Sequence, residues 1–118
     1  DVFIKSENSC WVIDSKYYMA TGAHDAPGWS DLVKQFFYIK AVKLIYPELE
    51  TVKNIFIFPG VKNVLSNIEM AYREESKDEE KLAKLMEDFI PIECLYLDPK
   101  DVMEKYLKSE KIHITDYI

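Results

Sequence analysis

The sequence predicts an α/β fold, a mixed sheet that contains an antiparallel hairpin and is flanked by helices. Two short runs of β-favouring residues lie at 1–6 and 10–16, with only a turn between them. A long apolar helical pattern follows, and further short apolar runs then alternate with helical patterns. Antiparallel neighbours need only a turn, whereas parallel neighbours need a crossover. We therefore expect both kinds of pairing in one sheet.

The first two strands are expected to pair as a tight hairpin. The two residues at 7–8 have the right length for its turn. If Ser6 faces Ser9, each step back along the first strand pairs with one step forward along the second, which places Asp1 opposite Asp14. Directly opposed residues have Cβ atoms only about 4.5–5.5 Å apart. The hairpin therefore predicts two carboxylates side by side.

Asp14 and Lys16 stand at the end of the second strand. Because side chains alternate along a strand, these two point to one side and Ser15 to the other. Together with Asp1, they form a patch of two carboxylates and one ammonium. Carboxylates so close repel each other unless a cation lies between them, and hard divalent cations such as Mg²⁺ prefer oxygen ligands. The pattern predicts a metal site.

Residues 19–29 are rich in Gly, Ala, Pro and Asp and are expected to form a loop. His24 and Asp25 within it have side chains suited to general acid–base catalysis. A loop histidine without a defined partner is more often idle, so both interpretations stay open. Trp29 is expected to anchor the loop on the following helix.

The next helix is expected to begin with Ser30 as its N-cap, to carry Asp31 favourably in its first turn and to stop before Pro47. Apolar residues occupy two stripes of it, so we expect it to be covered over much of its circumference. Lys34, Gln35 and Tyr38 are expected to form its polar edge.

The remaining chain is expected to continue the alternation of strands and helices. Strands are expected at 54–58, 67–73 and 92–97, helices at 80–89 and 99–108, and an edge strand in the tail at 111–118. Segment 67–73 alternates like a strand, although part of it also suits a helix. The tripeptide at 98–100 repeats the acid-x-lysine pattern, but its proline suits a helix start, so Asp98 is expected to cap a helix.

Length and composition suit one domain. The chain has 118 residues, of which 48% are hydrophobic. It begins with Asp rather than Met, so we expect a piece of a larger polypeptide. No apolar run is long enough to span a membrane, and no secretory signal is present. Cys10 and Cys94 lie in apolar runs without a CxxC pattern, which favours buried structural thiols in a reducing cytoplasm.

The net charge of −6 argues against a chain that binds nucleic acid tightly by itself. The first 46 residues are neutral, with five acidic and five basic side chains, so the whole acidic excess lies in residues 47–118. Clustered Lys and Arg supply affinity for the phosphate backbone. Any tight DNA binding is therefore expected in another domain or subunit.

An acid on one strand followed by Asp-x-Lys on the next resembles the PD-(D/E)xK nuclease superfamily. More narrowly, DSKYY at 14–18, APGWSD at 26–31 and KQFFY at 34–38 resemble the catalytic domain of LlaJI-type restriction endonucleases, relatives of the McrC nuclease subunit. The upstream helix usual in that superfamily is missing. The resemblance implies that residues 1–118 are a single nuclease-like catalytic domain with a restriction-endonuclease-like fold, from a larger protein.

The resemblance also implies roles for individual residues. Asp1 and Asp14, helped by the Ser15 carbonyl, would hold Mg²⁺, or Mn²⁺ in its place, to activate a water and offset charge on the scissile phosphate. Lys16 would orient that water or neutralise the developing anion. Gln35 would position phosphate or water, although a solvated amide is an equal alternative.

The function implied is Mg²⁺-dependent cleavage of double-stranded DNA by a cytoplasmic restriction system. A separate AAA+ nucleotide-hydrolysing, McrB-like subunit and a separate target-recognition domain would complete it, and a homo-oligomer is compatible with it. One alternative is a non-catalytic protein-docking module that keeps the nuclease scaffold. In another, Asp14 and Lys16 form a surface ion pair of little energetic value.

Overall fold

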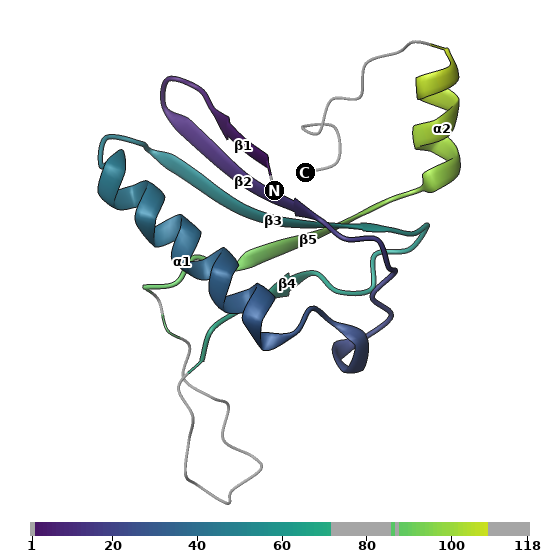
Figure 1. The fold of residues 1–118 in the computed structure, drawn as a ribbon, viewed down its shortest axis with the longest axis horizontal. Coiled ribbons are helices and arrows are strands. Elements are labelled where there is room, and N and C mark those ends of the chain that lie inside the picture. Colours follow the sequence, from purple (N-terminus) through teal and green to yellow (C-terminus); the bar gives the residue numbers. More distant parts are fainter. Residues whose placement is uncertain (1, 72–85, 87, 109–118) are drawn as a thin grey trace, which may run out of the picture.

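One mixed sheet with a helix against its face forms the centre of the fold (Figure 1). The computed structural model describes residues 2–71, 86 and 88–108. Its elements in chain order are β1 (Val2–Lys5), β2 (Ser9–Ser15), the 3₁₀ helix η1 (Ala23–Asp25), α1 (Trp29–Ile45), β3 (Thr51–Pro59), β4 (Asn67–Ile68), β5 (Ile92–Leu97) and α2 (Pro99–Leu107). The five strands lie in the order β1-β2-β3-β5-β4. The predicted α/β class is confirmed.

Strands β1 and β2 form the expected antiparallel hairpin. Val2 pairs with Ile13 in the register that the turn length predicted, and the backbone N–H of Ser6 donates to the Ser9 carbonyl at 2.9 Å. Asp1 lies outside the described residues, so its proximity to Asp14 stays a prediction.

The central strands run parallel. β2 pairs with β3, placing Asp14 opposite Phe56, and β3 pairs with β5 in the same direction. Helix α1 supplies the crossover between β2 and β3, as parallel neighbours require (Figure 1). The carboxyl ends of these strands therefore meet at one edge of the sheet, and Asp14 lies near that edge on β2.

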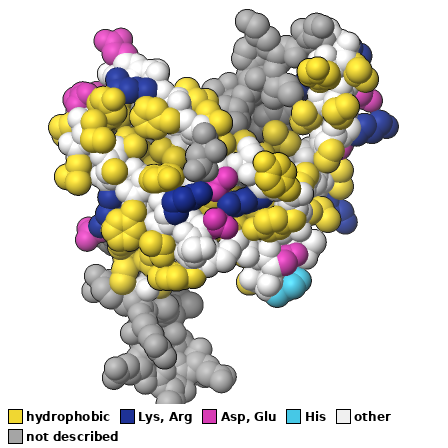
Figure 2. Space-filling model, viewed as in Figure 1, with side chains coloured by type: hydrophobic (Ala, Val, Ile, Leu, Met, Phe, Trp, Pro, Cys, Tyr) yellow, Lys and Arg dark blue, Asp and Glu magenta, His cyan; other side chains and the backbone are white. Residues whose placement is uncertain are grey.

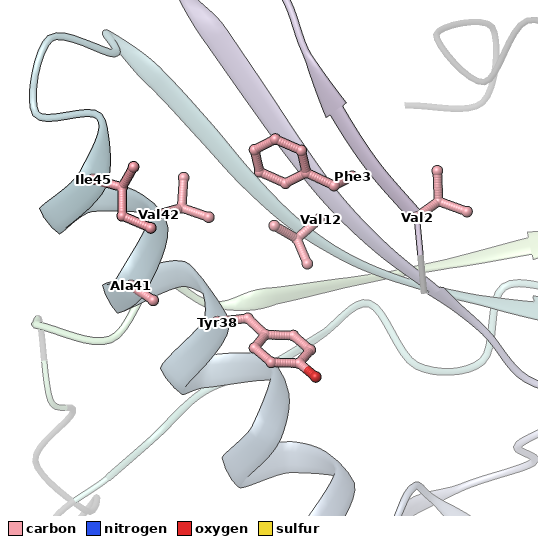
Figure 3. A pocket seen from close by; sticks show the side chains of 7 residues that line it. All are labelled: Val2, Phe3, Val12, Tyr38, Ala41, Val42 and Ile45. Atoms are coloured by element: carbon pink, nitrogen blue, oxygen red, sulfur yellow. The ribbon is translucent and has the colours of Figure 1, made fainter.

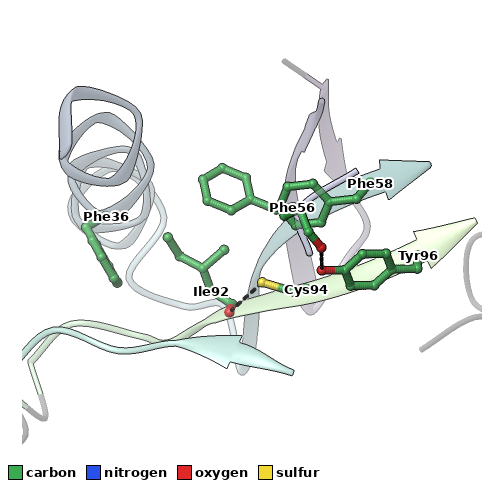
Figure 4. Close-up of a cluster of buried hydrophobic side chains, with 7 residues drawn as sticks. Phe36, Phe56, Phe58, Ile92, Cys94 and Tyr96 are labelled. Atoms are coloured by element: carbon green, nitrogen blue, oxygen red, sulfur yellow. Dashed lines mark hydrogen bonds between the residues drawn. The ribbon is translucent and has the colours of Figure 1, made fainter. Parts of the chain in front are cut away.

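Most of the core lies between α1 and the sheet, in two clusters. Alternate residues of β3 and β5 face the helix, as expected for strands that are covered on that side. The first cluster consists of Ala20, Phe36, Phe56, Phe58, Ile92, Cys94 and Tyr96, six of which are labelled in Figure 4. The second consists of Cys10, Val12, Ile39 and Val42. Both cysteines are buried free thiols, as predicted.

Tyr96 ties two loops to the first cluster. Its hydroxyl donates to the Ala20 carbonyl at 2.8 Å and accepts the Leu65 backbone N–H at 3.2 Å. The loop that leaves β2 is thus fastened to β5, which holds the approach to α1 in place.

The start and the coverage of α1 differ from expectation. Gly28, not Ser30, is the N-cap, because its backbone is extended and Trp29 already begins the helix. Trp29 is 68% exposed, so its predicted role as an anchor is wrong. Within the described residues α1 buries one face, and Phe37 and Leu44 are 54% and 83% exposed. The expected wide coverage is therefore not found there.

Later elements are confirmed in part. The strand expected at 54–58 is the middle of the longer β3. Of the strand expected at 67–73, Asn67–Ile68 form β4 and pair with β5, whereas residues 72–73 lie outside the described part of the chain. Helix α2 begins at Pro99, and the Asp98 carboxylate accepts the Lys100 N–H at 2.9 Å, as its predicted capping role requires.

The expected helix at 80–89 lies mostly outside the described residues. Of its described members, Phe89 donates its N–H to the Met86 carbonyl at 3.2 Å in a turn, and its ring meets that of Phe36 edge to face. The edge strand expected at 111–118 also lies outside them. No helix in the described part of the chain has the length and hydrophobicity that a bilayer crossing demands.

The packing makes a direct prediction for stability. Phe56 is fully buried, so Phe56→Ala should cost about 3–5 kcal/mol of unfolding free energy through the cavity it leaves. Leu44→Ala, on the exposed side of α1, is the control and should cost less than about 1 kcal/mol. Urea unfolding measures both, and equal losses would contradict the packing described.

Candidate active site

The candidate site lies between the carboxyl end of β2 and the first turns of α1. Because side chains alternate along β2, Asp14 and Lys16 lie on the same face as Cys10 and Val12. Cys10 and Val12 pack under α1. The backbone N–H of Lys16 donates to the Ile57 carbonyl at 2.8 Å, so pairing with β3 continues past the last strand residue. This pairing fixes the direction of both charged side chains.

Asp14 and Lys16 form an ion pair, which confirms that they share one side of the strand. The Lys16 Nζ lies 2.8 Å from the Asp14 Oδ2. The two side chains are only 11% and 10% exposed, so the alternative of a surface pair is wrong. The Asp14 Oδ2 that makes this contact is itself buried.

Helix α1 adds a second pair of charges. Lys16 Nζ also lies 3.4 Å from the Asp31 Oδ2, and Lys34 Nζ lies 3.8 Å from the Asp14 Oδ2. We call Asp14, Lys16, Asp31 and Lys34 the charge cluster. Figure 2 shows charged side chains of both signs gathered in the middle of this face, among hydrophobic ones. Asp31 and Lys34 were not predicted as site residues, although their i, i+3 spacing on one helix face was available as a signal.

The environment of Lys16 keeps it charged. Burial opposes the charged form, but the Asp14 and Asp31 carboxylates outweigh that effect and raise the pKa of the ammonium. The Nζ also lies 5.2 Å from the centre of the Phe56 ring. Lys16 is therefore a cation at neutral pH, able to donate hydrogen bonds and neutralise negative charge but not to accept a proton.

Gln35 is fully buried beneath this cluster, so the alternative of a solvated amide is wrong. Helix α1 turns its side chain toward the sheet, where Nε2 donates long hydrogen bonds of 3.3 and 3.4 Å to the Val12 and Ile55 carbonyls. Its Oε1 has no hydrogen-bond partner among the described residues. Gln35 thus bridges β2 and β3.

Asn54 is a second buried amide, and it was not predicted as a site residue. It pairs in register with Val12, is fully buried, and neither of its amide atoms has a hydrogen-bond partner among the described residues. An unpartnered buried amide is costly and therefore unusual. The signal was an asparagine at the start of an otherwise apolar run.

The residues present suit a hard divalent cation. The Asp14 carboxylate supplies oxygen atoms of the kind that such an ion prefers, and it lies at the carboxyl end of β2. Within the described ranges no three His, Cys, Asp or Glu side chains gather as a metal site. Asp1 lies outside those ranges, and the roles of Asp1 and of the Ser15 carbonyl stay predictions.

In the loop before α1, the Asp25 carboxylate stabilises the local backbone. Asp25 accepts hydrogen bonds from the Thr21 hydroxyl, the Thr21 N–H and the Gly22 N–H at 2.6 to 2.9 Å. These bonds, those from Thr21 first, lower the pKa of Asp25. The His24 side chain is 76% exposed, with its Nε2 3.9 Å from that carboxylate. The contacts of Asp25 are those of a loop organiser.

A separate apolar groove lies between β1 and α1 (Figure 3). It encloses about 330 Å³, and its lining residues are Val2, Phe3, Val12, Tyr38, Ala41, Val42 and Ile45. The Tyr38 hydroxyl is the one polar side-chain group in this lining. Such a lining does not suit a phosphate and distinguishes the groove from the charge cluster.

Comparison with known proteins identifies the family. The model of the LlaJI restriction endonuclease family matches residues 1–91, a span that includes the hairpin, the whole charge cluster and Gln35. None of the curated proteins and none of the solved structures matches the chain. The matched family indicates DNA endonuclease activity, with DNA as the substrate. The chain belongs to the LlaJI restriction endonuclease family.

Proposed function

We propose that the protein is the catalytic domain of a Mg²⁺-dependent endonuclease that hydrolyses phosphodiester bonds in double-stranded DNA. One observation carries this proposal: the buried Asp14 carboxylate, at the carboxyl end of β2, faces the ammonium groups of Lys16 and Lys34. An acceptor for a metal ion then lies beside cations suited to a phosphate. Membership of a restriction endonuclease family supports the same chemistry.

Asp14 is the first proposed ligand of Mg²⁺, or of Mn²⁺ in its place. Asp1 and the Ser15 carbonyl are proposed to complete the protein ligands, because the hairpin register continues toward Asp1 and Ser15 follows Asp14 directly. A bound ion of this kind makes a water nucleophilic at neutral pH and offsets charge on a phosphate.

In this proposal, Lys16 and Lys34 interact with the phosphates of the DNA. Lys16 is held as an ammonium, so it orients the attacking water or stabilises the negative charge that builds on the phosphate, without accepting a proton. Lys34, whose side chain is 37% exposed, is the more accessible of the two and is placed to meet the DNA backbone. Gln35 would hold the β2 end, and so Asp14, in position.

We propose that tight DNA binding comes from elsewhere in the enzyme. The chain carries a net charge of −6 and its first 46 residues are neutral, which gives little general attraction for DNA. An AAA+, McrB-like subunit and a separate recognition domain in the cytoplasm fit this requirement and the family resemblance.

A second candidate function is a non-catalytic docking module. The exposed apolar groove between β1 and α1 favours it, since contiguous apolar surface on a soluble domain commonly marks a protein contact. This function would make no use of the charge cluster, which allows the two candidates to be separated.

Metal binding separates them. Calorimetric titration of Mn²⁺ into the protein should show binding that Asp14→Ala abolishes, because Asp14 supplies the proposed carboxylate ligand. A docking module has no need of such binding. A wild-type protein with no Asp14-dependent heat would contradict the endonuclease proposal.

Cleavage by the complete enzyme tests the catalytic roles. Asp14→Ala and Lys16→Ala should each lower the rate of plasmid cleavage by at least about 10²-fold, with circular dichroism unchanged. Asp101→Ala removes a carboxylate on α2 that pairs with Lys105 and serves as the control, with cleavage expected at the wild-type rate. Wild-type cutting by either site variant would remove that residue from the mechanism.

Gln35→Leu tests whether the buried amide serves catalysis or only packing. Leucine has a similar volume and no unpartnered oxygen, so the free energy of unfolding should change by less than about 1.5 kcal/mol. Cleavage should fall by roughly tenfold or more, because the link from α1 to the β2 and β3 carbonyls is lost. Normal cleavage by a stable variant would show that the amide is structural.

A further inference from the structure

We propose that Asp31 is a positioning residue that provides an alternative partner for the Lys16 ammonium and so allows Asp14 to accept a divalent cation. The inference rests on the proposed metal role of Asp14. It assigns a function to a carboxylate of α1 that neither the strand motif nor its predicted place in the first helical turn suggested.

The geometry presents a conflict that Asp31 resolves. In the structure, Lys16 Nζ lies 2.8 Å from Asp14 Oδ2 and so already occupies the carboxylate that is the proposed metal ligand. An ammonium and a divalent cation on one carboxylate repel each other strongly at such range. Lys16 therefore has to shift when the ion binds.

The direction of that shift is limited by the surroundings of Lys16. Its side chain is only 11% exposed, and Phe56 lies against its ammonium. Lys34, the other group of the charge cluster beside Asp14, is itself a cation. Asp31 Oδ2 already lies 3.4 Å from Lys16 Nζ, so a shift toward it keeps the ammonium paired without moving it into bulk water.

Asp31 as a direct metal ligand is the competing interpretation. Within the described residues, the charged group that Asp31 contacts in the cluster is the Lys16 ammonium, at 3.4 Å. The side chain of Asp31 is 40% exposed, whereas that of Asp14 is 10% exposed. These features favour contact through Lys16, and the two interpretations make opposite predictions in the absence of Lys16.

A double-mutant cycle on Mn²⁺ affinity tests the inference. Calorimetry on the wild type, Asp31→Asn, Lys16→Met and the double variant gives four dissociation constants under the same buffer conditions. Asp31→Asn should weaken binding by roughly three- to tenfold when Lys16 is present. The loss should be at least about threefold smaller in the Lys16→Met background, because no ammonium then competes for Asp14.

The controls separate this inference from the proposed function. Asp101→Asn removes the same charge from α2 and should leave the affinity unchanged, and thermal melting confirms that each variant is folded. An equal or larger loss from Asp31→Asn in the Lys16→Met background would overturn the inference and leave Asp14 as a ligand. Absence of Asp14-dependent binding in the wild type would overturn both proposals.

Discussion

The parallel pairing of β2 with β3 is the constraint on which the site depends. It continues beyond the end of β2 through the hydrogen bond from the Lys16 N–H to the Ile57 carbonyl. Because the pleat is fixed over this length, Asp14 and Lys16 must project beneath α1. Gln35 reinforces the same pairing by contacting a carbonyl of each strand. A shift of one residue in this register would turn both charges to the opposite face of the sheet.

The burial of the charge cluster is better explained by function than by stability. A nearly buried ion pair loses much of its hydration, and its mutual attraction often does no more than offset that loss. Here the cost is reduced because each central charge has two partners of opposite sign: Asp14 faces Lys16 and Lys34, and Lys16 faces Asp14 and Asp31. An apolar pair would fill the same space more simply. Charges held at this position are therefore suited to meet another charged species.

Local patterns predicted the fold well, whereas contacts between elements limited the prediction of the site. Alternation along β2 correctly placed Asp14 and Lys16 together, and the turn length fixed the hairpin register. The burial of Gln35 was missed because helical spacing gives the relative directions of side chains but not how far a helix is rotated against its sheet. For the same reason, Asp31 was assigned only to the helix end. The contacts of α1 with β2 and β3 determine both positions.

The charge balance of the cluster bears on how a metal ion would be held. Its two carboxylates and two ammonium groups cancel, so the cluster is neutral before any ion binds. A dication added to a neutral, largely buried group leaves an excess of two positive charges, which low dielectric makes costly. Further negative charge must come with the ion, and the predicted neighbour Asp1 and a DNA phosphate are the two sources that the proposed function provides. Metal affinity should therefore rise when DNA is present, because the phosphate and the ion each lower the electrostatic cost of binding the other.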